Sequence, residues 1–320
     1  MFASAVAMSL MLAIAGAVHA QAHFPSRPIR LVVPAIAGSQ ADTVSRMIAQ
    51  KLAESWAQAI VIDNRAGASG IIAASILAKA APDGHTLMFT LPNFAISAVL
   101  QTGLPYDPLK DFAAATHIGY ATNVLVASPA LGVRSVAELT ALARGQPGKL
   151  VFASGSAGSA GHLSALRFCL AAQIKVIHVS FKGVPEATIE VLAGRAQLHL
   201  GTLGVNMPFI KDGKLTALAV TAPQRAAALP DVPALAETLP EFKRPETSQG
   251  LLAPAGVARP VLEKISREVA RILDLPDVKE RLQSIGYTIA PSTPEEYTRL
   301  LRAQIETLSR VTREVGLRPK

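Results

Sequence analysis

The chain lacks the features that usually mark an enzyme or a metalloprotein. Its 320 residues include a single cysteine, Cys169, so no intramolecular disulfide can form, and no neighbouring base marks this thiol as a nucleophile. The seven histidines are scattered, with no pair at metal-ligand spacing on one helix, so no metal site is expected. Neither a P-loop nor a dinucleotide-binding glycine pattern occurs, and no cofactor is expected.

Basic clusters and long apolar runs are scarce as well. The formal net charge is +8, but the Lys and Arg residues are scattered without runs, which argues against nucleic-acid binding. Beyond the N-terminus no segment approaches the length of a membrane span. The length itself suggests two domains with sizeable cores.

The N-terminal segment contains no Lys, Arg, Asp or Glu before Arg27. A short apolar stretch over 8–15 and the small-residue site Val18-His19-Ala20 predict a secretory signal peptide at residues 1–20, cleaved near Ala20. The mature protein would then lie outside the cytoplasm. An uncleaved membrane anchor is the alternative, and the missing positive start of the peptide leaves the true translation start open.

Two segments have the order strand, small-residue turn, helix. In the first, a strand over 29–33 leads through the turn 35–41 into a helix that Ser39 or Asp42 caps. In the second, residues 153–159 are only Gly, Ala and Ser and precede another helix. The unpaired N–H groups and the positive dipole end of such a helix can receive an anion, although either segment is also compatible with an ordinary surface turn.

Strands and helices alternate twice along the chain, over 29–90 and again over 150–221, and the remainder is mostly helical. This pattern predicts two α/β units with parallel or mixed sheets flanked by helices. Because ligands bind beyond the carboxyl ends of parallel strands, the loop 90–93 after a predicted strand is a third candidate wall of a binding site.

Catalytic groupings are weak. Ser156 or Ser159 together with His162 comes nearest to a nucleophile and its base. No strict G-x-S-x-G motif is present, and a triad also needs an oriented acid. A serine hydrolase or transferase is therefore the alternative, and we expect no enzyme.

Ordered motifs run through almost the whole chain beyond the predicted signal peptide. They are FPSRPIRLVVP at 24–34, DNRAGASG at 63–70, APDGHTL at 81–87, LPYDPLKDF at 104–112, QPGKL at 146–150, HVSFKG at 178–183, ALPDVP at 228–233, GLLAPAG at 250–256 and STPEE at 292–296. In this order they resemble the Bug family, which are periplasmic solute receptors of tripartite tricarboxylate transporters.

The resemblance implies a two-lobed periplasmic-binding-protein fold of type II (Venus flytrap) that closes on a small carboxylate. Lobe 1 would comprise residues 24–124 plus 250–320, and lobe 2 residues 125–249. It also implies a periplasmic monomer that hands its ligand to membrane transporter subunits. A sensory adaptor that docks on a signalling protein with the same ligand bound is the alternative.

The resemblance implies that the turn after the first strand holds the ligand carboxylate through backbone groups and ordered water. Three further turns would form the other walls of the site, one in the same lobe and two in the opposing lobe. The implied residues are Ala35, Ala37, Gly38, Ser39, Gln40 and Asp42 in the first turn, Thr90, Pro92 and Asn93 in the second, Ser154, Gly155, Ser156, Gly158, Ser159 and His162 in the third, and Gly201 and Thr202 in the fourth.

The chain departs from the usual family pattern within these turns. Ser39 and Gln40 stand where glycine is common, and Gly201-Thr202 replaces an aspartate–asparagine pair. The Gln40 side chain would narrow the pocket or replace a bridging water. Loss of the aspartate removes a partner for a ligand ammonium group, so an amino-acid ligand is not expected.

Overall fold

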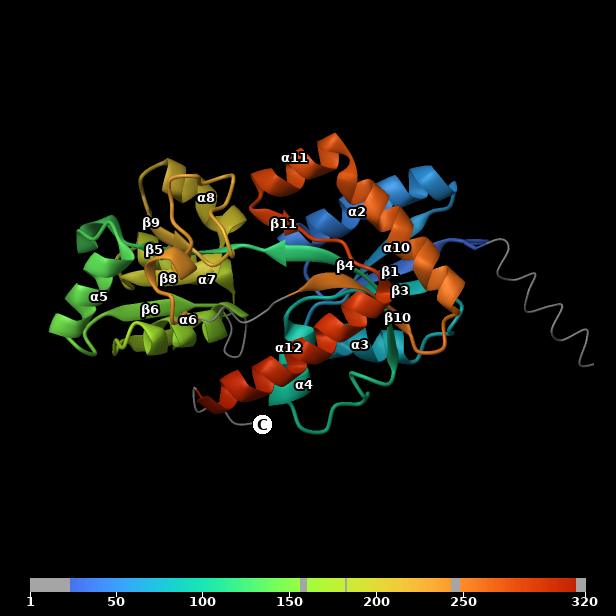
Figure 1. The fold of residues 1–320 in the computed structure, drawn as a ribbon, viewed down its shortest axis with the longest axis horizontal. Coiled ribbons are helices and arrows are strands. Elements are labelled where there is room, and N and C mark those ends of the chain that lie inside the picture. Colours follow the sequence, from blue (N-terminus) through green and yellow to red (C-terminus); the bar gives the residue numbers. More distant parts are fainter. Residues whose placement is uncertain (1–23, 156–159, 182, 243–247, 315–320) are drawn as a thin grey trace, which may run out of the picture.

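A computed structural model describes residues 24–155, 160–181, 183–242 and 248–314 of the chain. It contains two mixed sheets, each flanked by helices, that lie side by side (Figure 1). We call the six-stranded sheet with its helices lobe 1, and the five-stranded sheet with its helices lobe 2. The predicted fold class is thereby confirmed, while the exact lobe boundaries stay a prediction.

Lobe 1 is built on a sheet with the strand order β11-β4-β10-β3-β1-β2. Strand β1 pairs in parallel with β2 and β3, and β10 runs antiparallel to β3 and β4. The strands are β1 (Ile29–Val33), β2 (Ile60–Asn64), β3 (Thr86–Phe89), β4 (Phe112–Ala121), β10 (Gln249–Pro254) and β11 (Tyr287–Ile289).

The helices of lobe 1 come from both ends of the described chain. They are α2 (Gln40–Trp56), α3 (Ile71–Ala78), α4 (Asn93–Leu100), α10 (Arg259–Asp274), α11 (Pro276–Ser284) and α12 (Pro294–Glu314), with the 3-10 helix η1 (Ala68–Gly70). Ile265, Val269 and Ile272 recur at helical spacing on α10 and share one core with Val44 and Ile48 of α2. Burying each such side chain contributes about 1.5–3 kcal/mol. The C-terminal helices therefore complete lobe 1.

Lobe 2 has the strand order β7-β6-β8-β5-β9. Strand β6 is parallel to β7 and β8, and β5 is antiparallel to β8 and β9. Its elements are β5 (Asn123–Ala127), η2 (Pro129–Leu131), α5 (Val136–Gly145), β6 (Val151–Ser154), α6 (Ala160–Ala171), β7 (Ile177–Ser180), α7 (Val184–Leu192), β8 (Leu198–Thr202), α8 (Leu203–Lys211), β9 (Thr216–Val220) and α9 (Leu235–Thr238).

The chain passes from lobe 1 to lobe 2 at Thr122, between β4 and β5 (Figure 1). The Thr122 N–H donates to the Gly286 carbonyl at 2.9 Å, and the Thr122 carbonyl accepts from the Leu203 N–H at 2.8 Å. Gly286 lies in lobe 1 and Leu203 begins α8 in lobe 2. The crossover is therefore hydrogen-bonded to both lobes.

The lobes also pack against each other at α6 and at the start of α8. Leu163 of α6 is fully buried among Ala95 and Ile96 of α4 and Leu308 of α12. At the start of α8, a Cβ on Gly204 would lie 3.0 Å from the Ile285 carbonyl oxygen. Helix α6 thus contacts lobe 1 on one side and α8 contacts it on another.

Several expectations about individual elements need correction. Strands β4 and β11 were not predicted: the small-residue run AAA over 113–115 shows no alternation, and β11 has only three residues. Gly201 and Thr202, expected in a loop, end β8 because Asn123 of β5 pairs with Thr202. Asn93, expected in a loop, begins α4. No described helix is both long and apolar enough to cross a membrane.

Candidate ligand-binding site

The four predicted turns lie at the carboxyl ends of four strands, β1 and β3 in lobe 1 and β6 and β8 in lobe 2. Strands β1 and β3 are parallel neighbours, as are β6 and β8, so each lobe brings two turns to one edge of its sheet. The contacts of Leu163 and Gly204 hold the lobe 2 helices that follow these turns against lobe 1. We call these four turns the candidate site.

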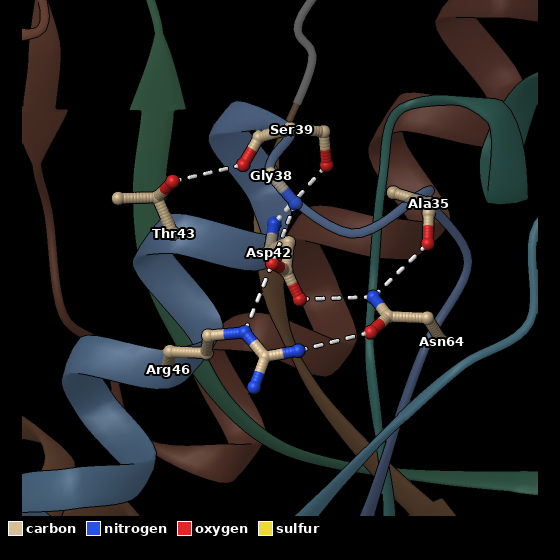
Figure 2. Close-up of polar contacts among 7 residues, drawn as sticks. All are labelled: Ala35, Gly38, Ser39, Asp42, Thr43, Arg46 and Asn64. Atoms are coloured by element: carbon tan, nitrogen blue, oxygen red, sulfur yellow. Dashed lines mark hydrogen bonds and ion pairs between the residues drawn. The ribbon is translucent and has the colours of Figure 1, made fainter.

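The turn between β1 and α2 is organised by the carboxylate of Asp42 (Figure 2). Its Oδ2 accepts from the Gly38 N–H at 2.8 Å and from Arg46 Nε at 2.9 Å, and its Oδ1 accepts from Asn64 Nδ2 at 2.9 Å. Asn64 Nδ2 also donates to the Ala35 carbonyl at 3.1 Å. Asp42 thereby ties the start and the middle of the turn to α2 and to the end of β2.

The electrostatics of this turn favour a charged Asp42. Its side chain is only 3% exposed, and burial by itself raises its pKa. The hydrogen bonds from Arg46, the Gly38 N–H and Asn64 outweigh burial, so the pKa of Asp42 lies below its ordinary value of 3.8. Both oxygens are engaged by the chain itself, so the carboxylate shapes the turn.

The first turn of α2 carries main-chain donors. Ser39 is the N-cap, with its Oγ accepting from the Asp42 N–H at 3.3 Å and its carbonyl from the Thr43 N–H at 2.9 Å. The N–H groups of Gln40 and Ala41 have no acceptor within the described part of the chain. With the positive end of the α2 dipole, these two donors suit an anionic group.

The Gln40 side chain lies at the boundary between the lobes. Its Nε2 donates to the Ile285 carbonyl at 3.2 Å, and a Cβ on Gly204 of α8 would lie 3.7 Å from the same nitrogen. Gln40, which stands where glycine is common in the family, therefore contacts the Ile285–Gly286 turn of lobe 1 beside the start of α8.

The turn after β3 is linked to the core of lobe 1. Thr90 is 1% exposed. Its Oγ1 lies 2.6 Å from the Tyr297 hydroxyl and accepts from the Gly250 N–H at 2.8 Å. Pro92 is the N-cap of α4, and Asn93 lines a small cavity of about 10 Å³ beside Pro34. The Thr90 side chain thus joins β3 to β10 and α12.

Ser154, the last residue of β6 before the third turn, has a fully buried side chain. Its Oγ donates to the Gly155 carbonyl at 3.1 Å, and its own carbonyl accepts from the Phe181 N–H at 3.0 Å. The predicted residues Ser156, Gly158 and Ser159 lie outside the described residues.

His162, in the first turn of α6, packs against a second histidine. Its ring centroid lies 4.6 Å from that of His178 on β7. Burial lowers the pKa of His162. Burial, with a smaller contribution from the charge of His162, lowers the pKa of His178 to about 4. Both rings are therefore neutral at pH 7, which suits packing better than holding an anion by charge.

The carboxyl end of β8, at Gly201 and Thr202, is shaped by a buried histidine. His199 is fully buried, and its Nδ1 lies 3.0 Å from the Ala153 carbonyl, so Nδ1 carries the proton. A Cβ on Gly201 would lie 2.1 Å from His199 Nε2. The His199 ring therefore leaves no room for a side chain at position 201, so only glycine fits there. The neighbouring Thr202 carbonyl accepts from Asn206 Nδ2 at 3.0 Å.

Arg46, Asn64 and Tyr297 were missed by sequence reasoning. Asn64 ends a strand beside β1, so the rule that selected the turns after β1 and β3 could have selected it. Arg46 follows Asp42 by one helical turn and Tyr297 is distant in sequence, so only the fold brings Tyr297 to Thr90. The described ranges contain no group of three or more His, Cys, Asp or Glu that could hold a metal ion.

Two α/β lobes joined by a crossover, with the turns after parallel strands at their boundary, define a two-lobed solute-binding protein. Residues 44–317 match the model of the tripartite tricarboxylate transporter family receptor. The chain belongs to this periplasmic receptor family, whose members are solute-binding proteins and not enzymes. The Bug-family resemblance and the expected absence of an enzyme are thereby confirmed.

Individual relatives resemble the chain over nearly its whole length. Protein BugT of Bordetella pertussis is 30% identical over 300 residues, which cover 93% of this chain and 92% of BugT. Rpa4515 of R. palustris, solved with adipate, is 31% identical with a TM-score of 0.84, covering 93% of this chain and all of that one. MatC of Rhodopseudomonas palustris, solved with bound malate, is 29% identical with a TM-score of 0.75, and the match covers 90% of this chain and 99% of MatC.

Proposed function

We propose that the chain is the exported receptor of a tripartite transporter and that it captures a small organic carboxylate between its lobes. Family membership supports the receptor role, and the adipate and malate in two relatives support the ligand class. In this proposal residues 1–20 are a cleaved signal peptide, and the receptor is a periplasmic monomer that delivers its ligand to the membrane subunits.

The ligand carboxylate would lie at the first turn of α2. The single observation that carries this placement is the pair of Gln40 and Ala41 N–H groups, which have no acceptor in the described part of the chain. Asp42 does not bind the ligand in this proposal but fixes the turn through Gly38 and Asn64. The turns after β3, β6 and β8 would enclose the rest of the ligand, and proximity to Gly204 makes Gln40 a second wall.

Two substitutions at one position separate the backbone donor from the side chain. Gln40→Ala removes the amide and keeps the N–H, whereas Gln40→Pro removes both. Proline suits this first helical position, and Ser39 before it is already extended, with φ −69° and ψ 165°. Titration calorimetry with adipate, malate and related acids first identifies the ligand for the unchanged protein.

If the N–H binds the carboxylate, Gln40→Pro weakens binding at least about tenfold relative to Gln40→Ala, which corresponds to roughly 1.4 kcal/mol. Equal affinities of the two variants would contradict placement of the anion at α2. Thr298→Ala, at an exposed position on α12 where the hydroxyl donates to the Pro294 carbonyl, serves as a control that leaves affinity unchanged.

A further inference from the structure

A second cavity of about 600 Å³ lies between the lobes, and its walls come from both of them. Residues 222–227 after β9 form the lobe 2 wall, and residues 279–289 of α11 and β11 contribute the lobe 1 wall. Thr122 of the crossover lies between these walls. We call it the rear cavity.

The rear cavity lies across the crossover from the candidate site. In lobe 1 the crossover strand β4 separates β11 from β10, β3 and β1, and in lobe 2 β5 separates β9 from β8 and β6. The candidate site follows β1, β3, β6 and β8, whereas the rear cavity is lined from β9 and β11. The two sites therefore occupy opposite sides of one crossover.

The lining of the rear cavity suits a small anion with an apolar body. Arg225 and Lys279 are its charged lining residues, and none of the described residues that line it is Asp or Glu. Each cation pairs with an acid beyond the lining, Arg225 with Glu237 at 2.9 Å and Lys279 with Asp274 at 2.6 Å.

Two side-chain amides complete the polar part of the lining. The side-chain amides of Gln224, from lobe 2, and Gln283, from lobe 1, have no hydrogen-bond partner among the described residues. Ala226 and Ile289 add apolar surface. A carboxylate that accepted from both amides would bridge the lobes, and the volume lies within the 300–1,000 Å³ range typical of small-molecule sites.

One turn connects the rear cavity to the candidate site. The Ile285 carbonyl accepts from Gln40 Nε2 at 3.2 Å, and Gly286, which lines the cavity, accepts from the Thr122 N–H at 2.9 Å. A Cβ on Gly286 would lie 2.6 Å from Leu203 Cδ2 at the start of α8. This close packing leaves the turn little freedom to move independently of either site.

We propose that the rear cavity is a second binding site, for a small monocarboxylate with a short apolar body, and that its occupancy raises affinity for the ligand at the candidate site. The cavity has its present volume while Leu163 and Gly204 hold the lobes in contact. A molecule that fits this volume selects that arrangement, in which the helices that follow the lobe 2 turns of the candidate site lie against lobe 1. Only the coupling rests on the proposed function, since the site itself does not require it.

The test uses hexanoate as the probe and amide chemical shifts of the isotope-labelled protein as the readout. Saturable shifts at residues 222–227 and 283–289 are expected. Ala227→Trp, an exposed position that would fill the cavity, should weaken hexanoate binding at least tenfold, whereas Ala303→Trp, exposed on α12, should leave it unchanged.

Shifts confined to the turns of the candidate site, unsaturable shifts, or equal binding by Ala227→Trp would each overturn the rear site. Failure of the proposed function is detected by a different experiment. It would show as equal affinities of Gln40→Ala and Gln40→Pro for the carboxylate that binds the candidate site. The coupling is tested by repeating that titration with saturating hexanoate, where at least a twofold gain is expected. No gain, or a loss, would overturn the coupling.

Discussion

The two lobes hold their parts of the candidate site by different kinds of contact. In lobe 1, the turn after β1 is fixed by charged groups, with Asp42 bonded to Arg46, Gly38 and Asn64. In lobe 2, the corresponding strand ends pack around neutral histidines, and burial lowers the pKa of His199 to about 4. An ion pair is most stabilising when its acid is ionised, whereas a buried neutral histidine is most stabilising when it is unprotonated.

This difference predicts that the lobes respond to acid in separate pH windows. Lobe 2 should lose stability as pH falls from about 6.5 toward 4, where the unfolded chain takes up protons that buried His199 and His178 do not. The contribution of Asp42 persists until pH falls below 3.8, because its folded pKa is lowered. Mild acid should therefore weaken lobe 2 before lobe 1.

The largest expected effect is this loss of lobe 2 stability. Between pH 7 and pH 4, His199 alone should cost about 3 kcal/mol of unfolding free energy, from its shift between 6.5 and about 4. Denaturant unfolding at a series of pH values measures it. His199→Asn keeps a donor for the Ala153 carbonyl and should flatten the profile in this window. An unchanged slope in the variant would refute the assignment.

Next in size is the loss of the lobe 1 ion network. Asp42→Asn removes the ion pair with Arg46 and one acceptor from a buried site, which should cost about 2 kcal/mol by denaturant unfolding at pH 7. Asp63→Asn is the matched control. Its partners Arg30 and Arg65 are about half exposed, so it should cost less than about 1 kcal/mol. Equal costs would show that Asp42 does not organise its turn.

A smaller effect is expected from crowding His199. Gly201→Ala places a Cβ 2.1 Å from His199 Nε2 and 2.8 Å from Val184 Cγ1, so overpacking should cost about 1.5 kcal/mol. Gly145→Ala, at the end of α5, meets nothing within 4 Å and should be neutral or slightly stabilising. Thermal unfolding of the pair gives the comparison, and indistinguishable midpoints would contradict the packing argument.

The smallest effect concerns the Gln40 side chain, which lies at the boundary between the lobes. Gln40→Ala removes one hydrogen bond to the Ile285 carbonyl and should cost about 0.5–1 kcal/mol. Gln50→Ala, on the same helix, removes an exposed contact with Glu54 and should change stability by less than about 0.5 kcal/mol. Denaturant unfolding of both variants distinguishes them, and a Gln40 effect no larger than that of Gln50 would show that the contact is not stabilising.

Local patterns in the sequence were sufficient to predict the main elements of both lobes. The strand over Ile29–Val33 and the helix that Ser39 caps follow from apolar spacing and from a cap beside its own helix. The small-residue turns identified where helices begin after parallel strands. These features depend on residues within a few positions of one another, so the sequence alone determines them.

The contacts that shape the candidate site were decided by tertiary structure. Whether Asp42 faces a ligand or its own turn depends on Asn64, and the space beside Gly201 depends on the rotamer of His199. The place where β8 ends depends on its pairing with β5, and the Gln40 contact with Ile285 joins residues 245 positions apart. Such contacts form only after the two sheets have packed, because no local pattern encodes which distant groups will meet.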